Sequence, residues 1–274
     1  MSLSGTIQRS YMSRHLFIAG AQRSGTTYLY HALDEHPAVE MARPVHPEPR
    51  FFLQEGSEDR LDEYLSKFFG AKKGVLIRGE KSTSYIESRE AARRISRVFP
   101  DAIVAFILRD PVYRAISNYW YTVSHHLEDQ PIDVLLDESA QSRPYKNVSV
   151  SPYAYLNRGR YVDYIDAYAD YFSPEQLRIL VHEDFVGNLQ AVKSFYESIG
   201  LPSDFVPPTL DDTINDAPYG LAATPPEIVE FLRSYYLDLN QRLSAKYAVD
   251  IGAWGAEESS RSAGGQSTRV TAAG

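Results

Sequence analysis

Residues 15–35, with the sequence HLFIAGAQRSGTTYLYHALDE, join an apolar run to a glycine-bounded loop and then to an amphipathic stretch. The apolar residues 15–19 predict a short buried strand, and residues 26–35 predict a helix with Leu29 and Leu33 on its inner side. A loop between such a strand and helix aims unpaired backbone N–H groups, and the positive end of the helix dipole, at an anion. This unit therefore restricts the chain to folds in which a helix starts directly beyond a buried strand, with an anion site between them.

The loop itself, Gly20-x-x-x-x-Gly25-Thr26-Thr27, has the spacing of a phosphate-binding P-loop with one change. Thr26 stands where a nucleotide hydrolase has the Lys that reaches the β and γ phosphates. Arg23 supplies a cation earlier in the loop instead. The loop is thus predicted to hold a phosphate ester rather than ATP or GTP; the alternative is a glycine turn without a ligand.

The composition of the 274-residue chain is that of an ordinary globular protein, with 43% hydrophobic and 23% charged residues. Its net charge of −8 argues against broad binding to nucleic acid or to a membrane surface, and leaves room for a local basic pocket. There are no cysteines, which excludes disulfides and thiolate metal sites. No apolar stretch reaches the roughly 18 residues of a membrane span, and the first residues lack the apolar centre of a signal peptide, so we expect a cytoplasmic protein.

Apolar runs and helical patterns alternate along the chain, which predicts an α/β, P-loop-type three-layer fold with a mainly parallel central sheet flanked by helices. The strand at 102–108, AIVAFIL, is apolar on both faces, as in a sheet that is covered on both sides. We expect one domain over residues 15–254, a flexible segment at 1–14 and a disordered tail at 255–274. The other strands are expected at 74–79 and 176–182, and the helices at 59–69, 88–98, 111–126, 153–171 (broken or bent near Gly159), 187–199 and 225–247. Loops are expected at 38–56 and 201–224, and a substrate-covering loop or an irregular insertion at 127–152.

Polar residues follow three of the predicted strands, at 20–27, 80–84 and 109–110. Ligands of such sheets bind beyond the carboxyl ends of the strands, so we expect these segments to meet. Arg109 leaves a strand there, and Ser117 follows on the next helix. This pair suits a second anion site, because a guanidinium gives forked, charge-assisted donors. Together with the first loop, the pair implies a ligand with two separated phosphates.

These segments resemble a known family. AGAQRSGTTYLYHALDEHP is similar to the 5′-phosphosulfate loop of sulfotransferases that use 3′-phosphoadenosine 5′-phosphosulfate (PAPS), and LRDPVYRAISNYW is similar to their 3′-phosphate motif. Further segments are similar to segments of the same family: PEPRFF, GEKSTSYI, and RGRYVDYIDAYADYF followed by QLRILVHEDF. The last part of the matching region, YYLDLNQRLSAKYAVDIGAW, is similar as well. The resemblance spans roughly residues 15–254 and is nearer to the carbohydrate/heparan and tyrosylprotein branches than to the cytosolic phenol or steroid branch.

The resemblance implies which residues hold the donor. The 5′-phosphosulfate is expected at five residues of the first loop, and the 3′-phosphate at two residues further on: Arg23, Ser24, Gly25, Thr26 and Thr27, then Arg109 and Ser117. Arg23 takes the place of a Lys that many heparan enzymes have in this loop, and is expected to serve as the cation beside the leaving group.

The resemblance also implies the catalytic residues. In the heparan sulfotransferases the catalytic carboxylate belongs to a Glu-x-x-Phe-Phe segment, which here falls on Glu48, although many relatives carry Lys where this chain has Pro47. His46 is a rival base, because the cytosolic branch uses His. The Lys of the Glu-Lys-Ser/Thr motif falls on Lys81, which is expected near the transferred group. Glu80 is either a structural partner of a neighbouring Arg or Lys, or a third candidate for the base.

The activity implied is in-line transfer of a sulfuryl group from PAPS to a hydroxyl, or as second choice an amine, of a carbohydrate or other small-molecule acceptor. The product of the donor would be 3′-phosphoadenosine 5′-phosphate (PAP), and no metal, nucleic acid or membrane partner is expected. Two alternatives stay open, a P-loop nucleotide kinase and a non-catalytic nucleotide-binding module. The absent Lys counts against the first, and the presence of Glu48 and Lys81 counts against the second.

Overall fold

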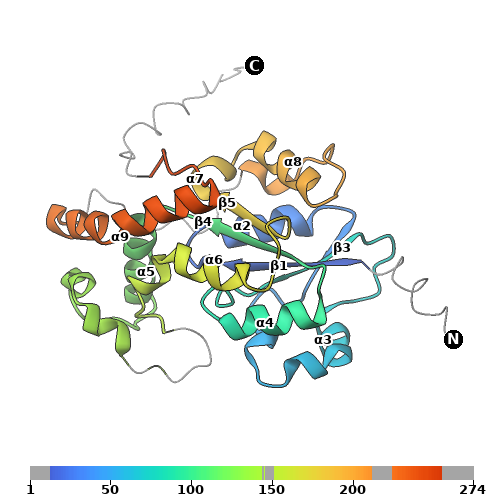
Figure 1. Ribbon diagram of the computed structural model, residues 1–274, viewed down its shortest axis with the longest axis horizontal. Helices are drawn as coiled ribbons and strands as arrows, with labels where there is room; N and C mark the ends of the chain where they lie inside the picture. The colour runs from blue at the N-terminus through green and yellow to red at the C-terminus, as the bar shows by residue number, and fades with distance from the viewer. Residues whose placement is uncertain (1–12, 144, 146–150, 212–223, 255–274) are drawn as a thin grey trace, which may run out of the picture.

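A parallel sheet organises the structure. The computed structural model describes residues 13–143, 145, 151–211 and 224–254. Within these residues the sheet has five parallel strands in the order β2-β3-β1-β4-β5, so the first strand lies at its centre (Figure 1). The strands are β1 (Arg14–Gly20), β2 (Val39–Met41), β3 (Ile77–Lys81), β4 (Ile103–Leu108) and β5 (Leu177–Val181).

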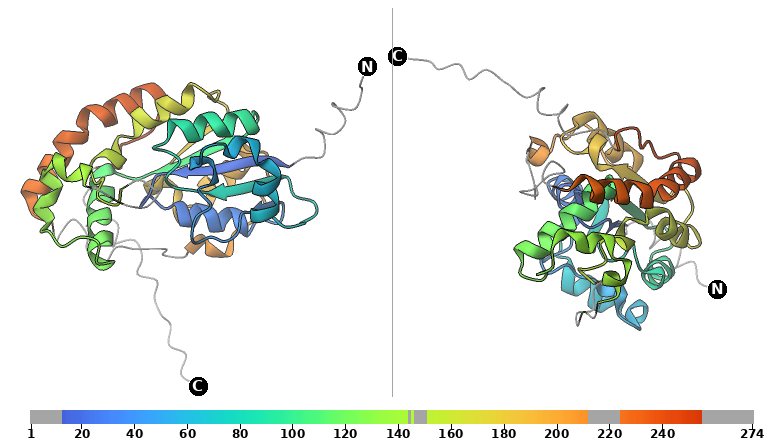
Figure 2. Two further views of the ribbon diagram at one scale, coloured as in Figure 1. Left: turned by 90° about the horizontal axis from the view of Figure 1, so that it is seen from below. Right: turned by 90° about the vertical axis from the view of Figure 1, so that its left-hand side faces the viewer.

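Helices cover both faces of this sheet, which confirms the predicted three-layer α/β fold (Figures 1 and 2). The α-helices are α2 (Thr26–Asp34), α3 (Leu61–Phe68), α4 (Arg89–Val98), α5 (Pro111–Ser124), α6 (Tyr161–Ala169), α7 (His182–Phe185), α8 (Leu189–Ser198) and α9 (Pro226–Tyr247). Short 3₁₀ helices lie between them: η2 (Phe51–Leu53), η3 (Ser57–Asp59), η4 (Ile132–Leu136), η5 (Glu138–Ser142), η6 (Asn157–Gly159) and η7 (Pro208–Asp211).

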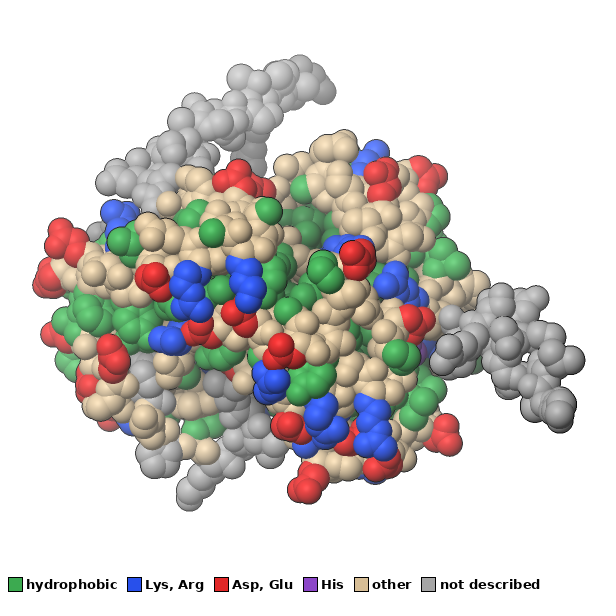
Figure 3. Space-filling view, in the orientation of Figure 1, with side chains coloured by type: hydrophobic (Ala, Val, Ile, Leu, Met, Phe, Trp, Pro, Cys, Tyr) green, Lys and Arg blue, Asp and Glu red, His purple; other side chains and the backbone are tan. Residues whose placement is uncertain are grey.

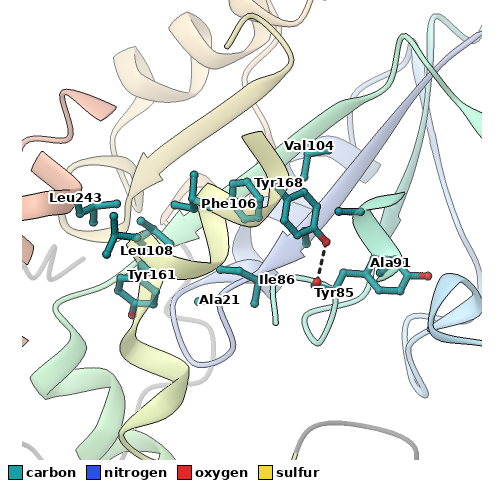
Figure 4. Packing of buried hydrophobic residues seen from close by; sticks show 14 of the residues in the cluster. Ala21, Tyr85, Ile86, Ala91, Val104, Phe106, Leu108, Tyr161, Tyr168 and Leu243 are labelled. Carbon is teal, nitrogen blue, oxygen red and sulfur yellow. Dashed lines mark hydrogen bonds between the residues drawn. The ribbon is translucent and has the colours of Figure 1, made fainter. Parts of the chain in front are cut away.

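The β4 strand shows why the sheet sits between two helical layers, since all six of its residues are buried. Its side chains alternate between two separate hydrophobic clusters, as the period of a strand requires. Ile103, Ala105 and Ile107 pack with α2 and α8, whereas Val104 and Phe106 face α4 and α6 (Figure 4). A strand that is apolar on both faces is stable only when both faces are covered, as predicted from its sequence.

Three predictions of local structure were wrong. Residues 38–56, expected as a loop, contain the edge strand β2 and the 3₁₀ helix η2; each has three residues, which is too short for a periodic signal. The expected loop at 127–152 holds η4 and η5. The expected helix at 153–171 is shorter, since η6 precedes α6 at the predicted break near Gly159. The segments at 1–12, 146–150, 212–223 and 255–274, on which other predictions fall, lie outside the described residues.

The carboxyl ends of the strands converge where α5 and α9 lie, at the left of Figure 1. α5 starts immediately beyond β4 because the Asp110 side chain caps it, accepting a hydrogen bond from the Val112 N–H at 2.9 Å, and Pro111 occupies the first turn. Among the described residues no helix is both long and apolar enough to cross a bilayer. Acidic and basic side chains are interspersed on the face shown in Figure 3.

Candidate active site

The loop between β1 and α2 presents an uncapped helix terminus. Gly25 is the N-cap residue of α2 in a left-handed conformation (φ 91°), with no side-chain cap, and the first turn of α2 has no acidic residue. A Cβ at Gly25 would also lie 2.7 Å from His182 Nδ1, which is itself 3.2 Å from the Ser24 carbonyl oxygen. Glycine is therefore required at position 25, both because of the positive φ and because a side chain would collide with His182. The positive end of the α2 dipole is left for an anion.

Arg23 joins this loop to α5. Its Nε donates to Ser117 Oγ at 3.1 Å, and its guanidinium lies 5.0 Å from the centre of the Tyr121 ring. Burial lowers the pKa of Arg23, and the charge of Arg109 lowers it further, while Tyr121 opposes the shift. The structure thus brings together Arg23, Ser117 and Arg109, which lie far apart in the sequence.

Arg109 extends from the end of β4 into the same region. Its guanidinium lies 5.6 Å from the Tyr113 ring, and its carbonyl oxygen accepts a hydrogen bond from the Tyr161 hydroxyl at 2.9 Å. The next residue is held as well, because the Asp110 N–H donates to Glu183 at 3.2 Å and Trp254 Nε1 donates to the other oxygen of Glu183. The backbone that carries Arg109 is therefore fixed from α6, α7 and the chain beyond α9.

Two half-buried cations, Arg23 and Arg109, beside an uncapped helix terminus fit an anionic ligand with two phosphates. Burial, and to a smaller extent repulsion from Arg109, lowers the pKa of Arg23, so a positive charge on Arg23 is unfavourable here. An anion between them would relieve this repulsion and would also accept hydrogen bonds from the first turn of α2. Among the described residues, no cluster of His, Asp and Glu suited to a metal is found; metal-free chemistry stays a prediction.

The Glu48 carboxylate is surrounded by hydrogen-bond donors from the end of β3 and the residues that follow it. Lys81 Nζ is 3.0 Å from Glu48 Oε1, and only 3% of the Lys81 side chain and 8% of the Glu48 side chain are exposed. The Thr83 backbone N–H donates to Glu48 Oε2 at 3.0 Å, and the Thr83 hydroxyl lies 3.1 and 3.0 Å from the two carboxylate oxygens. A carboxylate with these contacts is fixed in direction. The structure thus brings together Glu48 and Lys81, as predicted.

The register of the sheet places this carboxylate–lysine pair beside the anion loop. Lys81 is directly opposite Ile18 on the neighbouring strand β1, two residues before Gly20 begins the loop. The Ile86 N–H donates to the Ala19 carbonyl oxygen at 2.8 Å, which holds the chain after β3 against the end of β1. On the other side of β1, Gly20 is opposite Phe106 of β4, three residues before Arg109.

Glu80 has a different environment from the one predicted. It is fully buried, and it accepts hydrogen bonds from three hydroxyls, those of Tyr64, Ser82 and Tyr85, at 2.8, 2.6 and 2.7 Å. Burial raises its pKa to about 7, against the effect of these donors, and the charge of Glu48 adds to the rise. The expectation that Glu80 pairs with a neighbouring Arg or Lys was therefore wrong; its partners are uncharged.

His46 is an exposed residue on the segment before Glu48. Within the described part of the chain no hydrogen bond or ion pair to His46 is found, whereas Glu48 and Lys81 contact each other. Sequence reasoning missed Thr83, His182 and Glu183. The signal for Thr83 was present, because it follows Lys81 by two residues at a strand end, whereas His182 and Glu183 reach the site only through the fold.

A strand-end anion loop with two cations, next to a fixed carboxylate, fits an enzyme that transfers a group from a phosphate-bearing donor. Residues 13–217 match the family model described as "Sulfotransferase domain". The chain therefore belongs to the sulfotransferase family, the members of which use PAPS as donor, and the resemblance to its carbohydrate branch is confirmed.

Two curated relatives illustrate this similarity. Heparan sulfate glucosamine 3-O-sulfotransferase 3B1 of Mus musculus is 31% identical over 186 residues, which cover 65% of this chain and 44% of the relative. Bifunctional heparan sulfate N-deacetylase/N-sulfotransferase 3 of Homo sapiens is 31% identical over 172 residues, 60% of this chain and 19% of the relative. The match thus spans less than half the length of each of these relatives.

A solved structure is similar over nearly its whole length. The crystal structure of a sulfotransferase from Alicyclobacillus acidocaldarius has a TM-score of 0.73 and 27% identity, and the match covers 89% of this chain and 99% of that one. The sulfotransferase domain of the Synechococcus PCC 7002 olefin synthase, at 16% identity and a TM-score of 0.50, shares the fold.

Proposed function

We propose that this protein transfers a sulfuryl group from PAPS to a hydroxyl of a carbohydrate or other small-molecule acceptor, with an amine as the second choice. The observation that carries the proposal is the buried Glu48–Lys81 pair, which lies at the carboxyl end of β3, beside the end of β1 where the Arg23 loop begins. Family membership supports the donor, and relatives named for heparan sulfate support a carbohydrate acceptor.

The donor would be held by residues from two elements. The first turn of α2 and Arg23 would bind the 5′-phosphosulfate, with Ser24, Gly25, Thr26 and Thr27 lining the loop, and Arg109 and Ser117 would bind the 3′-phosphate. PAPS, when bound, supplies the sulfuryl group and a phosphate leaving group. Arg23 would then stabilise the negative charge that develops on the leaving oxygen.

Glu48 would act as the general base. Thr83 and Lys81 fix its carboxylate, so that it can accept the proton of the acceptor hydroxyl while the new O–S bond forms. Lys81, once shared with the sulfuryl oxygens, would stabilise their charge in the transition state. His46 remains the rival base, and its exposed position gives it none of these fixing contacts.

The test compares Glu48→Gln with His46→Gln. We expect Glu48→Gln to lower kcat by roughly 10²- to 10⁴-fold, the contribution of a general base, and His46→Gln to retain turnover. Binding of PAP, measured by calorimetry, should be retained in both variants and shows that the donor site is folded. Unchanged turnover of Glu48→Gln would remove Glu48 from the mechanism, and a loss confined to His46→Gln would make His46 the base.

A further inference from the structure

Glu80 is a fully buried carboxylate that the proposed mechanism does not use, although it directly precedes Lys81. Tyr64 donates to its Oε2, and Ser82 and Tyr85 both donate to its Oε1. Three hydroxyl protons are thus committed to one carboxylate. Burying an ionisable group is costly unless hydrogen bonds compensate, and these three hydroxyls supply them.

Two of these three hydroxyls continue to the segment that carries Glu48. Ser82 Oγ accepts a hydrogen bond from the Arg50 N–H at 2.8 Å, and the Tyr85 hydroxyl accepts one from the Phe52 N–H at 3.0 Å. Because Glu80 takes the single proton of each hydroxyl, the lone pairs of both hydroxyls are directed at these backbone groups. Each hydroxyl therefore relays the orientation set by Glu80 to residues 50–52.

The Tyr85 relay is anchored at both ends. The Tyr85 backbone carbonyl oxygen accepts a hydrogen bond from the Tyr168 hydroxyl at 2.7 Å, which is visible in Figure 4. On the receiving segment, Arg94 donates to the carbonyl oxygens of Phe52 and Leu53 at 3.1 and 3.2 Å. Arg50 lies in the left-handed region (φ 49°), a conformation that is unfavourable for a residue with a side chain and needs such support.

We propose that Glu80 is a positioning residue, which acts through the hydroxyls of Ser82 and Tyr85 to fix residues 50–52 and so holds Glu48 against Lys81 and Thr83. The segment from Glu48 to Arg50 lies outside the helices and strands, so its path depends on side-chain contacts, of which these two relays are a part. The inference rests on the proposed function in one respect, namely that Glu48 takes the acceptor's proton.

Tyr64 provides a matched control within the same cluster. Like Tyr85, it is fully buried and donates to Glu80. Unlike Tyr85, its hydroxyl has no hydrogen bond to residues 50–52; only its ring packs there, 5.2 and 5.1 Å from the rings of Phe51 and Phe52. Tyr64→Phe and Tyr85→Phe each keep the ring and remove one hydroxyl from Glu80, but only Tyr85→Phe breaks a relay.

The experiment measures kcat, the KM for PAPS, the melting temperature and amide hydrogen exchange over residues 48–54 in both variants. We expect Tyr85→Phe to lower kcat by roughly 10- to 100-fold, the cost of a misplaced catalytic group, with the KM for PAPS within about twofold. Exchange over residues 48–54 should become faster. Tyr64→Phe should lower the melting temperature similarly but leave kcat within about twofold, with exchange unchanged.

Two outcomes would overturn the proposal. Equal losses of kcat in the two variants, in proportion to their melting temperatures, would show that the cluster only supports packing. Unchanged exchange over residues 48–54 in Tyr85→Phe would show that the relay does not hold the segment. Exchange is read without turnover, so it decides the positioning role even if Glu48→Gln stays active, a result that would instead contradict the proposed base.

Discussion

Two carboxylates near the end of β3 differ in their surroundings and therefore in their chemistry. Glu48 contacts the ammonium group of Lys81, and 8% of its side chain is exposed. Glu80 is enclosed by hydroxyls and has no exposed surface. The sequence offered both as candidate bases, and residue type alone did not separate them. Burial and partners separate them, since a base must be reached by the proton that it accepts.

The environment of Glu80 predicts how stability depends on pH. Its pKa is about 7 in the folded protein because of burial, against 4.5 for an ordinary Glu. The folded state therefore holds this proton more tightly, so the contribution to stability is complete below pH 4.5 and is lost as the pH rises through 7. We expect the free energy of unfolding of Glu80→Gln to fall less between pH 5 and 8 than that of the unchanged protein.

Denaturant titrations of both proteins at the two pH values provide the measurement. A pH dependence of Glu80→Gln equal to that of the unchanged protein would mean that Glu80 titrates at its ordinary pKa.

At the scale of elements, α5 links the two predicted anion sites. The capped start of α5 fixes the direction in which Arg109 leaves β4, and Ser117, two turns further along, faces Arg23 of the first loop. The segment after α5 is also held: Arg143 Nη1 donates to buried Glu128 at 2.9 Å, as does the Tyr155 hydroxyl at 2.7 Å. Burial alone would raise the pKa of Glu128, and these donors lower it to about 2.

This arrangement predicts a ligand-specific effect of Arg109→Gln. Binding of PAP should weaken by about 10- to 100-fold, the range for a hydrogen bond to a charged group, because the 3′-phosphate loses its guanidinium. Binding of AMP, which has no 3′-phosphate, should change by less than about threefold. Calorimetric titration of both nucleotides gives the comparison, and equal weakening of PAP and AMP would place Arg109 elsewhere than at the 3′-phosphate.

At the scale of the whole molecule, the sequence predicted what depends on local pattern. The alternation of apolar runs gave the parallel sheet, and the glycine spacing gave the loop at the end of β1. The strand β2 was missed because it has three residues and lies in a proline-rich stretch. The partners of Glu80 were missed because Tyr64 and Tyr85 reach it through packing of α3 against β3 and the chain beyond it, which no local pattern encodes.

Other predictions concern properties beyond the described geometry. Three properties stay predictions: the cytoplasmic location, the limits of the domain at 15–254 and the roles of the donor-site residues. The acceptor is the largest open choice, and a screen of carbohydrate and small-molecule hydroxyls with labelled PAPS addresses it.

We infer that the Arg23 loop and the Arg109–Ser117 site act as one clamp for a ligand with two separated phosphates. Calorimetric titration of the protein with PAP and with ATP tests it most directly. We expect tight binding of one PAP per chain, with ATP weaker by at least about tenfold, because ATP lacks the 3′-phosphate and the loop lacks the Lys that reaches the β and γ phosphates. Tight binding of ATP without binding of PAP would contradict it.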